Sequence, residues 1–574
     1  MVMGSMKQNE WILPDADPRA DSLAAALGIP VKIARILVNR KITDAEGAQS
    51  FLHGTLEDVH DPFLLQGMRT AVERLRKAAS RGEKVLIFGD YDVDGVLSVV
   101  ILSRALSTLG AEVDYYIPDR LEEGYGLKMS HLQIVEEKQA RVVISVDCGI
   151  KAMDFVREAS SKGVDVIITD HHLPGDQLPE ALAVLNPVVP ESGYPHKSLA
   201  GIGVVFKLIQ ALFQGHPRES QLPHYLKLVS IGTVADIVSL TGENRIFVKY
   251  GLQGLEGVSN LGLKSLLSVC GLEHKRVQVS DIGFRIAPRI NAAGRMGRAD
   301  LAVQLFFSGS EEEARRIASE LNDMNRIRQG IEKKIYAQAT QRIRSQSLDQ
   351  RYKLLVLGCD EWHRGVIGIV ASKLKEDFHR PVLLFAYDDG KAHGSGRSIR
   401  EFPLIECLDH NRQYFHNYGG HPMAVGCELG IDDLPQLKQA MNAYVDNRIT
   451  EEDLRRKIRI DTRLDFDEIG AAFLDHFALL SPFGVGNPKP IFTTDDVEVV
   501  AAPRRLQEQH IKLLLKHNGR YFDAVGWGKG DWIDSLSKGG RISVVYSLQV
   551  KEYLGQERLT LVLEDMRQFR TSPT

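Results

Sequence analysis

The sequence predicts an α/β protein of several domains, with a parallel-sheet domain first and a small β-barrel last. Three observations indicate this fold class. Apolar, strand-like runs alternate with helical segments from Lys84 to Asp170, which is typical of a parallel sheet with helices on both faces. A long polar segment with apolar residues at helical spacing begins near Glu311. Short strands separated by turn residues follow from about residue 460 onward.

The length and composition narrow the class of protein. A chain of 574 residues exceeds one ordinary core and predicts several domains. A hydrophobic content of 44% and a charged content of 25% are those of a soluble globular protein, and no apolar run approaches the ~18 residues that a membrane span needs. The five cysteines form no CxxC pair, which argues against a zinc ribbon and fits a reducing cytoplasm. The net charge of −4 gives no global indication of a nucleic-acid partner.

We expect five segments along the chain. Residues 1–75 would form an N-terminal helical segment, residues 76–305 the parallel-sheet domain, and residues 306–352 a connecting helix. Residues 353–450 would form a second α/β domain, which begins at the strand-like run YKLLVLG and contains the glycine-rich segment HGSGRS. Residues 451–574 would form the small barrel or sandwich.

Acidic residues and histidines follow three predicted strands of the parallel-sheet domain. Asp90–Asp94 follow KVLIFG, Asp147 ends RVVISVD, and Asp170–His172 follow VDVIIT. In sheets of this kind, ligands bind beyond the carboxyl ends of the strands. Asp236 closes the helical run LKLVSIGTVAD and by itself would pass for a helix-end acid. Together, these groups at several element ends predict a functional site.

The segment GDYDVDG places Asp90, Asp92 and Asp94 at alternate positions. Carboxylates this close repel one another unless cations neutralise them, and hard oxygen ligands suit magnesium or manganese. Taken alone, the motif favours a calcium loop about as much as a catalytic site, because it resembles the start of an EF-hand. However, no glutamate follows at the twelfth position that such a loop requires.

The tripeptide Asp170-His171-His172 is a sharper indication of metal chemistry. Two adjacent histidines point in different directions, so that one can ligate a metal ion while the other faces a substrate. Asp170 would fix the tautomer of an imidazole. The alternative interpretation of this segment is a polar turn before LPGD, and Asp147 at a strand end is as often structural as functional.

Four motifs, GDYDVDG, SVDCG, ITDHH and GTVAD, occur in the order of those of the DHH superfamily of phosphoesterases. The segments GYGL, PRINAAGR and WHRGVIGI resemble the RecJ branch of that superfamily, and the resemblance extends from about residue 80 into the barrel. It implies a DHH catalytic domain, a DHH-associated second domain and a C-terminal OB-fold. It also implies a metal-dependent exonuclease that degrades single-stranded DNA 5′→3′ to mononucleotides in DNA recombination and repair.

The resemblance further implies two divalent ions, Mn²⁺ or Mg²⁺, held between the four motifs. Asp92 and Asp94 would each hold one ion, and Asp147 would bridge the two. His171 and Asp236 would complete the ligand set of the second ion. Many superfamily members have a histidine where this sequence has Phe88, and Asp90 would take its place as a ligand. The implied catalytic residues are His172, facing the scissile phosphate, Asp170, orienting the histidines, and the bridging Asp147.

The resemblance also assigns residues to the DNA. Arg120, Ser395 and Arg397 would bind a terminal 5′ phosphate, because arginine pairs with phosphate oxygens and a glycine-flanked loop exposes backbone N–H groups. Tyr125 would stack on a base, although a buried tyrosine in a turn is the commoner fate. The other candidate nucleic-acid contacts are Arg289, Arg295 and His421, and for the barrel surface Lys512, Lys516, Arg520, Tyr521 and Trp527. Each of these also has an ordinary structural explanation as a solvated or core side chain.

Two other functions compete with this one. A phosphodiesterase of the DHH type would act on short oligonucleotides or cyclic dinucleotides, with the same metal cluster but generally without an OB-like domain. A non-catalytic single-strand-binding replication factor would keep the fold without the cluster. The resemblance implies single-stranded DNA with a 5′ phosphate as substrate and, as partners, a single-strand-binding protein and a RecQ-type helicase. The unpaired cysteines and the lack of a long apolar run predict a cytoplasmic protein that contacts no membrane, and we expect a monomer.

Overall fold

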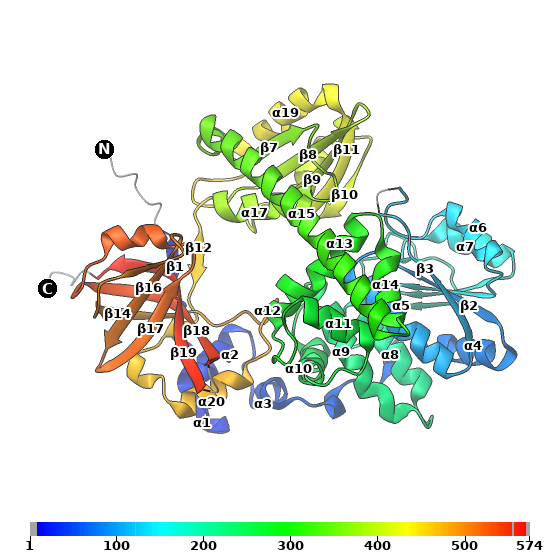
Figure 1. Cartoon of the computed structure of the whole chain (residues 1–574), viewed down its shortest axis with the longest axis horizontal. Helices are drawn as coiled ribbons and strands as arrows, with labels where there is room; N and C mark the ends of the chain where they lie inside the picture. The colour runs from blue at the N-terminus through cyan, green and yellow to red at the C-terminus, as the bar shows by residue number, and fades with distance from the viewer. Residues whose placement is uncertain (1–8, 121, 554–555, 570–574) are drawn as a thin grey trace. The chain divides into compact units, whose positions relative to one another are not determined.

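A computed structural model describes residues 9–120, 122–553 and 556–569 (Figure 1). The chain forms two compact units. The larger unit contains residues 60–238 and 247–456, and the smaller one contains residues 1–59, 239–246 and 457–574 as far as these are described. Among the described residues, no helix combines the length and the apolar character that crossing a membrane requires.

The larger unit begins with a five-stranded sheet in the order β3-β2-β4-β5-β6, in which all neighbouring strands are parallel. Helices α6 and α7 cover the face that contains Leu86, Phe88 and Val143, and α5 and α8 cover the other face. This confirms the predicted parallel sheet between two helical layers. The elements are α4 (Met68–Arg81), β2 (Lys84–Gly89), α5 (Val93–Thr108), β3 (Glu112–Tyr116), α6 (Leu132–Glu137), β4 (Val142–Val146), α7 (Met153–Ser161), β5 (Asp165–Thr169), β6 (Ala183–Leu185), α8 (Gly201–Phe213) and α9 (Leu222–Ala235).

A helical region and one long helix follow the sheet. The predicted connecting helix is confirmed as α15 (Glu311–Ser345), whose 35 residues span about 52 Å at 1.5 Å per residue. Its first part packs against α11, α13 and α14, and its last part against α17 of the next domain (Figure 1). The remaining helices are α10 (Gly242–Gly254), α11 (Leu261–Val269), α12 (Val279–Asp281), a π-helical turn (Ile282–Ile286), α13 (Ala287–Arg295), α14 (Ala299–Phe307) and α16 (Leu348–Arg351).

The second α/β domain has a mixed five-stranded sheet in the order β10-β11-β9-β8-β7. Only the pair β7–β8 is parallel in this sheet, and the other three pairs are antiparallel. Its elements are β7 (Leu355–Cys359), α17 (Ile367–Phe378), β8 (Val382–Asp388), β9 (Lys391–Arg397), α18 (Leu404–His410), β10 (Asn417–His421), β11 (Ala424–Gly430) and α19 (Leu434–Asp446).

The smaller unit contains a seven-stranded sheet, in which the extra pairing of β14 with β16 closes β14, β18, β19, β17 and β16 into a five-stranded barrel. The prediction of an OB-like barrel is confirmed. Its strands and helix are β12 (Lys457–Arg459), β13 (Thr462–Arg463), α20 (Ala471–Leu479), β14 (Phe492–Val499), β15 (Arg504–Leu506), β16 (His510–His517), β17 (Arg520–Gly526), β18 (Arg541–Tyr553) and β19 (Gln556–Gln568).

The first helices of the chain belong to the core of this barrel. Helices α1 (Arg19–Leu27), α2 (Val31–Asn39) and α3 (Ala45–His53) share one apolar cluster with α20 and the barrel strands, and β1 (Glu10–Ile12) pairs with β12. Trp11 Nε1 donates a 2.8 Å hydrogen bond to Asp565 Oδ2. Arg245, from the short segment 239–246, donates to the carbonyls of Phe51 and Leu480. The sequence patterns placed residues 1–75 and 451–574 in separate segments, whereas the structure packs residues of 1–59 against residues of 457–574 in one unit.

Candidate metal centre and phosphate-binding cluster

Three neighbouring parallel strands end at the same edge of the first sheet and bring the predicted ligands together. β4 lies between β2 and β5, with Gly89 opposite Val146 and Val146 opposite Thr169. The residues directly after these strand ends are therefore side by side. Asp90, Asp147 and Asp170 are the first residues after β2, β4 and β5, and all three are buried.

The helix starts behind this edge fix two of the carboxylates. Asp92 is the N-cap of α5, and its side chain accepts hydrogen bonds from the backbone N–H groups of Asp94 and Gly95. Asp94 accepts from the backbone N–H groups of Gly201 and Ile202, at 2.8 and 2.6 Å, where α8 begins. Backbone N–H donors at helix starts therefore fix the position of both carboxylates.

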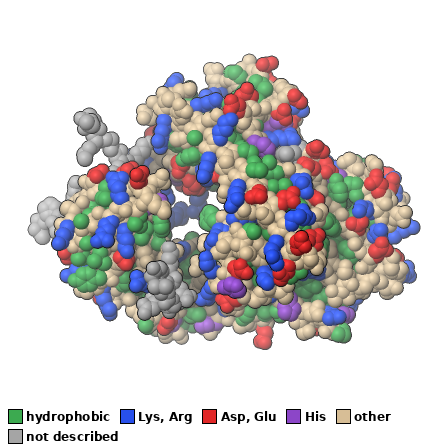
Figure 2. All heavy atoms as spheres, viewed as in Figure 1, with side chains coloured by type: hydrophobic (Ala, Val, Ile, Leu, Met, Phe, Trp, Pro, Cys, Tyr) green, Lys and Arg blue, Asp and Glu red, His purple; other side chains and the backbone are tan. Residues whose placement is uncertain are grey.

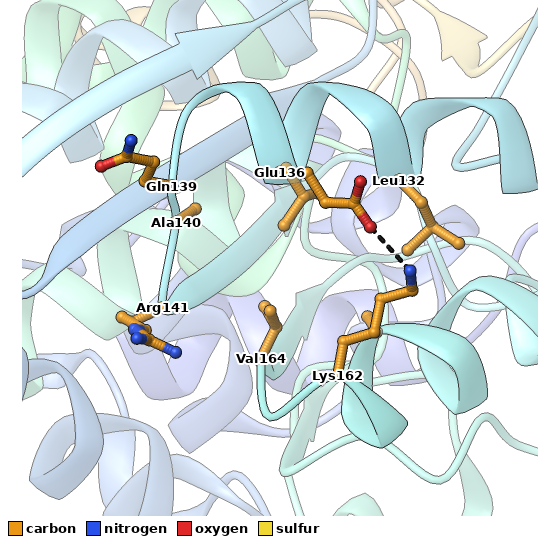
Figure 3. A pocket seen from close by; sticks show the side chains of 9 residues that line it. Leu132, Glu136, Gln139, Ala140, Arg141, Lys162 and Val164 are labelled. Carbon is orange, nitrogen blue, oxygen red and sulfur yellow. Dashed lines mark hydrogen bonds and ion pairs between the residues drawn. The ribbon is translucent and has the colours of Figure 1, made fainter.

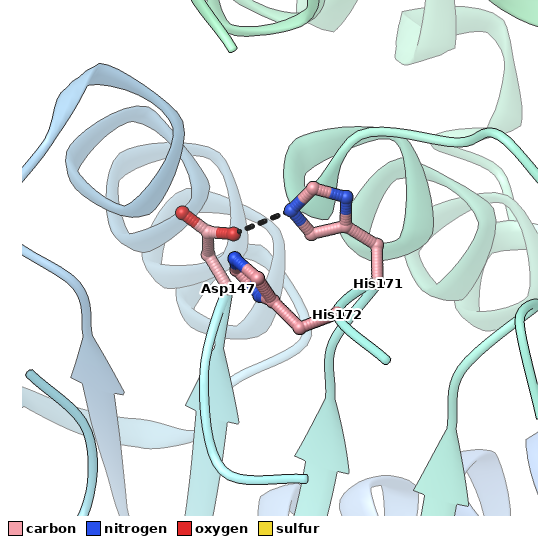
Figure 4. Close-up of side chains that lie close together, drawn as sticks. All are labelled: Asp147, His171 and His172. Carbon is pink, nitrogen blue, oxygen red and sulfur yellow. Dashed lines mark ion pairs between the residues drawn. The ribbon is translucent and has the colours of Figure 1, made fainter. Parts of the chain in front are cut away.

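The predicted ligands form two groups whose ligand atoms lie within 4.8 Å of one another. Asp90, Asp92 and Asp147 make one group, and Asp94, His171 and Asp236 make the other. Asp147 Oδ1 lies 3.0 Å from His171 Nε2 and so links the two groups, as Figure 4 shows for Asp147 and His171. Asp236 Oδ2 lies 3.5 Å from the same nitrogen. All six ligands that the sequence suggested are therefore gathered at one place. Asp90 lies in the same group as Asp92, whereas Asp94 lies in the other group.

The donor set fits divalent cations. One atom each of Asp90, Asp147, His171 and Asp236 is buried and has no hydrogen-bond partner among the described residues. Buried polar atoms normally find partners, so these four atoms are suited to ligate a cation. Carboxylate oxygens with one imidazole suit manganese and magnesium.

The electrostatics of the cluster lead to the same conclusion. Burial first, and then the charge of Asp92, raises the pKa of Asp94 to about 7 and that of Asp90 well above its usual range. Burial, and then the charge of Asp94, raises the pKa of Asp236 to about 9. Burial, and then the neighbouring His172, lowers the pKa of His171 to about 4, so this imidazole is neutral and able to ligate a metal.

Asp170 holds His172 in a fixed orientation. Its Oδ1 lies 2.8 Å from His172 Nδ1 and accepts from the backbone N–H of His171, while Oδ2 accepts from the backbone N–H of Ile150. Burial lowers the pKa of His172, but the hydrogen bond and charge of Asp170 outweigh it, so that the net shift is upward. This contact leaves His172 Nε2 free to face a substrate.

Tyr125 lies at the metal centre. Its hydroxyl donates to the backbone carbonyl of Asp147 at 3.1 Å and lies 3.1 Å from His172 Nδ1. The side chain is nevertheless 45% exposed. The sequence suggested base stacking for Tyr125, and the structure adds a direct contact with two residues of the candidate catalytic set.

Two residues of the site have strained backbones. Asp147 has a φ of 61°, and Ile237, which directly follows Asp236, has a φ of 62°. Left-handed backbone is uncommon for aspartate and unfavourable for a β-branched residue. Strain of this kind concentrates at functional sites, because the surrounding structure must enforce it.

A cluster of arginines lies beside the first acidic motif. The Arg120 guanidinium is 5.0 Å from the centre of the Tyr91 ring. Burial, followed by the positive charges of Arg120, Arg328 and Arg397, lowers the pKa of Arg295 to about 9. Arginines lower the pKa of one another in this way when too few anions neutralise them. We therefore define the arginine cluster as Arg120, Arg295 and Arg397.

The second domain contributes a strand and a helix start to this cluster. Arg397 Nη1 donates to Ser395 Oγ at 3.3 Å, and both side chains come from β9. A Cβ on Gly368, in the first turn of α17, would lie 2.8 Å from Ser395 Oγ and 3.3 Å from Arg397 Nη2. Glycine is therefore required there, and the N-terminus of α17 lies against both side chains. Helix N-termini bind phosphate groups.

The other two suggested DNA contacts have different surroundings. Arg289 uses its guanidinium within the protein, since it donates to Asn322 and to the carbonyls of Arg285 and Val269. His421 is exposed at the end of β10, where it pairs with Ala424, the β11 residue that also pairs with Arg397 of β9. We do not assign either to the arginine cluster.

A cavity of about 470 Å³ lies between α6, α7 and the amino ends of β4 and β5, opposite the metal centre, and contains the ion pair of Glu136 and Lys162 (Figure 3).

Burial, and then the charge of Asp170, raises the pKa of Cys148 far above its usual range. This thiol is therefore unsuited to act as a nucleophile.

The barrel carries exposed aromatic and basic residues. Tyr521 is 53% and Trp527 is 50% exposed, so neither belongs to the barrel core. The Lys516 ammonium lies 5.2 Å from the Tyr521 ring centre, and Lys512 pairs with Asp523 at 3.3 Å. On the face of the molecule that Figure 2 shows, Lys and Arg side chains are mixed with Asp and Glu, in agreement with the small net charge.

Comparison with known proteins identifies the family. The chain matches the N-terminal domain of the DHH family over residues 84–233, the DHHA1 domain over residues 351–447 and the RecJ OB domain over residues 460–565. The single-stranded-DNA-specific exonuclease RecJ of Bacillus subtilis (strain 168) is 38% identical, in an alignment that covers 98% of this chain and 71% of that protein. The chain belongs to the RecJ family.

Other RecJ proteins show the same relationship. RecJ of Escherichia coli (strain K12) is 32% identical, over 94% of this chain and 96% of that protein. The crystal structure of Thermus thermophilus RecJ in complex with Mn²⁺ matches with a TM-score of 0.83 at 30% identity, covering 98% of this chain and 80% of that chain. The Mg²⁺ complex of the same RecJ matches with a TM-score of 0.76 at 28% identity, covering 98% and 79%.

The sequence patterns did not predict three features of the candidate site. Arg328 of α15 acts on the pKa of Arg295 from a distant part of the chain. The N-terminus of α17 lies against Ser395 and Arg397. Glu123 lies in the motif that provides Arg120 and Tyr125 and makes several hydrogen bonds. The glycines of GVIGI are a signal for the second feature, whereas the first depends on tertiary packing alone.

Proposed function

We propose that this RecJ family member is a metal-dependent exonuclease that degrades single-stranded DNA 5′→3′ to mononucleotides in DNA recombination and repair. The observation that carries the proposal is a two-part metal centre beside an arginine cluster. The metal centre would hold the scissile phosphate, and the arginine cluster would hold the terminal phosphate. The relatives named exonuclease RecJ and the RecJ structures with Mn²⁺ and Mg²⁺ support the reaction and the cofactor.

The roles of the metal ligands follow from their grouping. Asp90 and Asp92 would hold one ion, Asp94, His171 and Asp236 the other, and Asp147 both. When bound, two divalent ions supply a deprotonated water and neutralise the charge that develops on the phosphate.

The catalytic part of the proposal concerns His172. Because Asp170 binds its Nδ1, the imidazole presents Nε2 to the substrate side. Its raised pKa favours the protonated form, which would donate to a phosphate oxygen. The Tyr125 hydroxyl lies beside the same Nδ1 atom, so that both contacts leave Nε2 to the substrate.

The 5′ polarity of the proposal rests on the arginine cluster. Arg120, Ser395 and Arg397, with Arg295, would bind a terminal phosphate monoester, which carries more charge than an internal diester. The start of α17 would add backbone N–H donors. Exposed Tyr521 and Trp527, with basic neighbours on the barrel, would bind bases and phosphates of the single strand.

The proposed partners rest on family likeness alone. We propose that the protein acts as a cytoplasmic monomer, together with a single-strand-binding protein and a RecQ-type helicase. Co-purification of tagged protein with either partner from cells that are repairing DNA would test this part.

One assay tests the reaction. The protein is incubated with Mn²⁺ and an oligonucleotide that carries a 5′ phosphate and a 3′ label. We expect stepwise shortening from the 5′ end with release of mononucleotides. Cleavage confined to dinucleotides would favour a short-oligonucleotide phosphodiesterase, and binding without cleavage would favour a non-catalytic factor. The complete ligand set and the barrel weigh against both.

A further inference from the structure

One irregular segment connects the arginine cluster with the metal centre. It runs from residue 117 to residue 128, between β3 and a short 3₁₀ turn at Met129–His131. Its described residues form no helix or strand, yet they provide Arg120 and Tyr125. Irregular backbone has no hydrogen-bond ladder to hold it, so its side chains must fix its conformation.

Glu123 is the centre of the hydrogen bonds that hold this segment. Its carboxylate accepts from the Tyr116 hydroxyl at 3.0 and 2.9 Å and from the backbone N–H of Asp119 at 2.7 Å. Its Oε2 also lies 2.9 Å from His131 Nε2. One side chain thus joins the end of β3, the start of the segment and the turn that closes it.

The direction of each hydrogen bond requires a carboxylate at position 123. The backbone N–H of Lys128 donates to His131 Nδ1 at 2.9 Å, so the proton of this imidazole is on Nε2 and points at Glu123. Tyr116, Asp119 and His131 are then all donors, and an amide at position 123 would bring its NH₂ group against one of them. His131 is only 2% exposed, so water does not replace a lost partner there.

The held segment contacts both parts of the site. Asp119 lies near the end of α13, because a Cβ on Gly297 would be 2.8 Å from its Oδ2, and α13 carries Arg295. Arg120 stacks on Tyr91 in the first acidic motif, and the Tyr125 hydroxyl reaches Asp147. A shift of the segment would therefore move Arg120 relative to the metal ligands.

We propose that Glu123 is a positioning residue that fixes Arg120 in the arginine cluster and so sets the preference for a 5′-phosphorylated end. The proposal rests on the function proposed above. In this role Glu123 acts through the segment from Tyr116 to His131, which its hydrogen bonds hold.

The test compares Glu123→Gln and Glu123→Ala with wild type and with Arg120→Ala. kcat and KM are measured with Mn²⁺ on single strands that carry a 5′ phosphate or a 5′ hydroxyl. We expect both variants to lose about ten- to a hundredfold of the kcat/KM ratio between the two ends, mainly through KM for the phosphorylated end. Adding Arg120→Ala to Glu123→Ala should lower this ratio little further, because Glu123→Ala already displaces the guanidinium that Arg120→Ala removes.

The matched control is Glu122→Gln, since the neighbouring Glu122 is exposed and only its backbone N–H bonds to Asp119. Tyr116→Phe removes one donor and leaves the carboxylate, so a smaller change in the same ratio is expected. Equal losses on both ends, or additive effects of Arg120→Ala and Glu123→Ala, would overturn the proposal while leaving the exonuclease function intact. A wild type that does not distinguish the two ends would overturn the end recognition proposed above, and this inference with it.

Discussion

The Asp147 carboxylate lies between the two groups of metal ligands. It is 2% exposed, it contacts His171, and its Oδ1 has no hydrogen-bond partner among the described residues. Its backbone is held in the left-handed region. A side chain in this position serves the site more than the fold, because an unsatisfied buried carboxylate costs stability when no cation is present.

We predict that Asp147→Asn abolishes hydrolysis while the protein stays folded. Loss of the shared ligand should lower kcat by about two orders of magnitude or more, since even residues that only support metal ligands account for roughly 10- to 100-fold. The matched control is Asp154→Asn on α7, an exposed aspartate paired only with Arg157. Turnover near the wild-type rate at saturating Mn²⁺, with unchanged circular dichroism, would contradict the assignment.

Metal binding should release protons. At pH 7.5 and without metal, Asp236 with a pKa of about 9 is largely protonated, and Asp94 with a pKa of about 7 is partly so. A cation displaces these protons, so we expect release of about one proton or more and weaker Mn²⁺ binding as the pH falls from 9 to 6. Calorimetry in two buffers of different ionisation enthalpy measures this release, and identical heats in both would count against it.

At the scale of elements, the start of α8 closes onto the metal centre. A Cβ on Gly201 would lie 2.7 Å from Asp147 Oδ1, and the Gly201 N–H donates to Asp94. The close approach of helix and ligand therefore depends on the missing side chain.

We predict that Gly201→Ala weakens Mn²⁺ binding about tenfold and costs about 1–3 kcal/mol of stability by overpacking. Gly257→Ala is the control, because a Cβ at that position meets nothing within 4 Å. Mn²⁺ titration and thermal unfolding measure the two effects, and equal behaviour of the two variants would refute the role of Gly201.

Periodicity and motif order were sufficient for the elements and for the clustering of the ligands. Parallel strand ends meet at one edge, so Asp90, Asp147 and Asp170 could be placed together from the strand order alone. The division of the ligands into two groups came only from the family resemblance, because it depends on where Asp92 caps α5 and where α8 meets Asp94. The sequence could not reveal the contact of Tyr125 with His172, since a segment without regular structure connects them.

At the scale of the whole molecule, the apolar core of the barrel is shared between both ends of the chain. Residues of α1–α3, such as Ile33 and Leu37, belong to one cluster with Phe466 and Phe492. Hydrophobic patterns mark each of these residues as buried but do not say against which partner. This is why the sequence suggested two separate segments.

We predict that deleting residues 457–574 alone yields a protein that aggregates, because α1–α3 then expose their core face to water. Deleting residues 1–59 together with 457–574 should give more soluble protein. This deletion removes both parts of the barrel core and leaves only the short segment 239–246 of the smaller unit. Size-exclusion chromatography of both truncations measures this. A monodisperse single truncation would show that α1–α3 do not need the barrel.

The pairing of β1 with β12 and of Trp11 with Asp565 has a consequence during protein synthesis. The ribosome releases α1–α3 before the barrel strands with which they pack, and these strands emerge only after the intervening residues have been translated. At roughly 5–20 residues per second, that delay is on the order of 20–80 seconds. Throughout this time the nascent chain presents apolar helices without a partner, so we expect newly made protein to depend on chaperones that bind its first sixty or so residues.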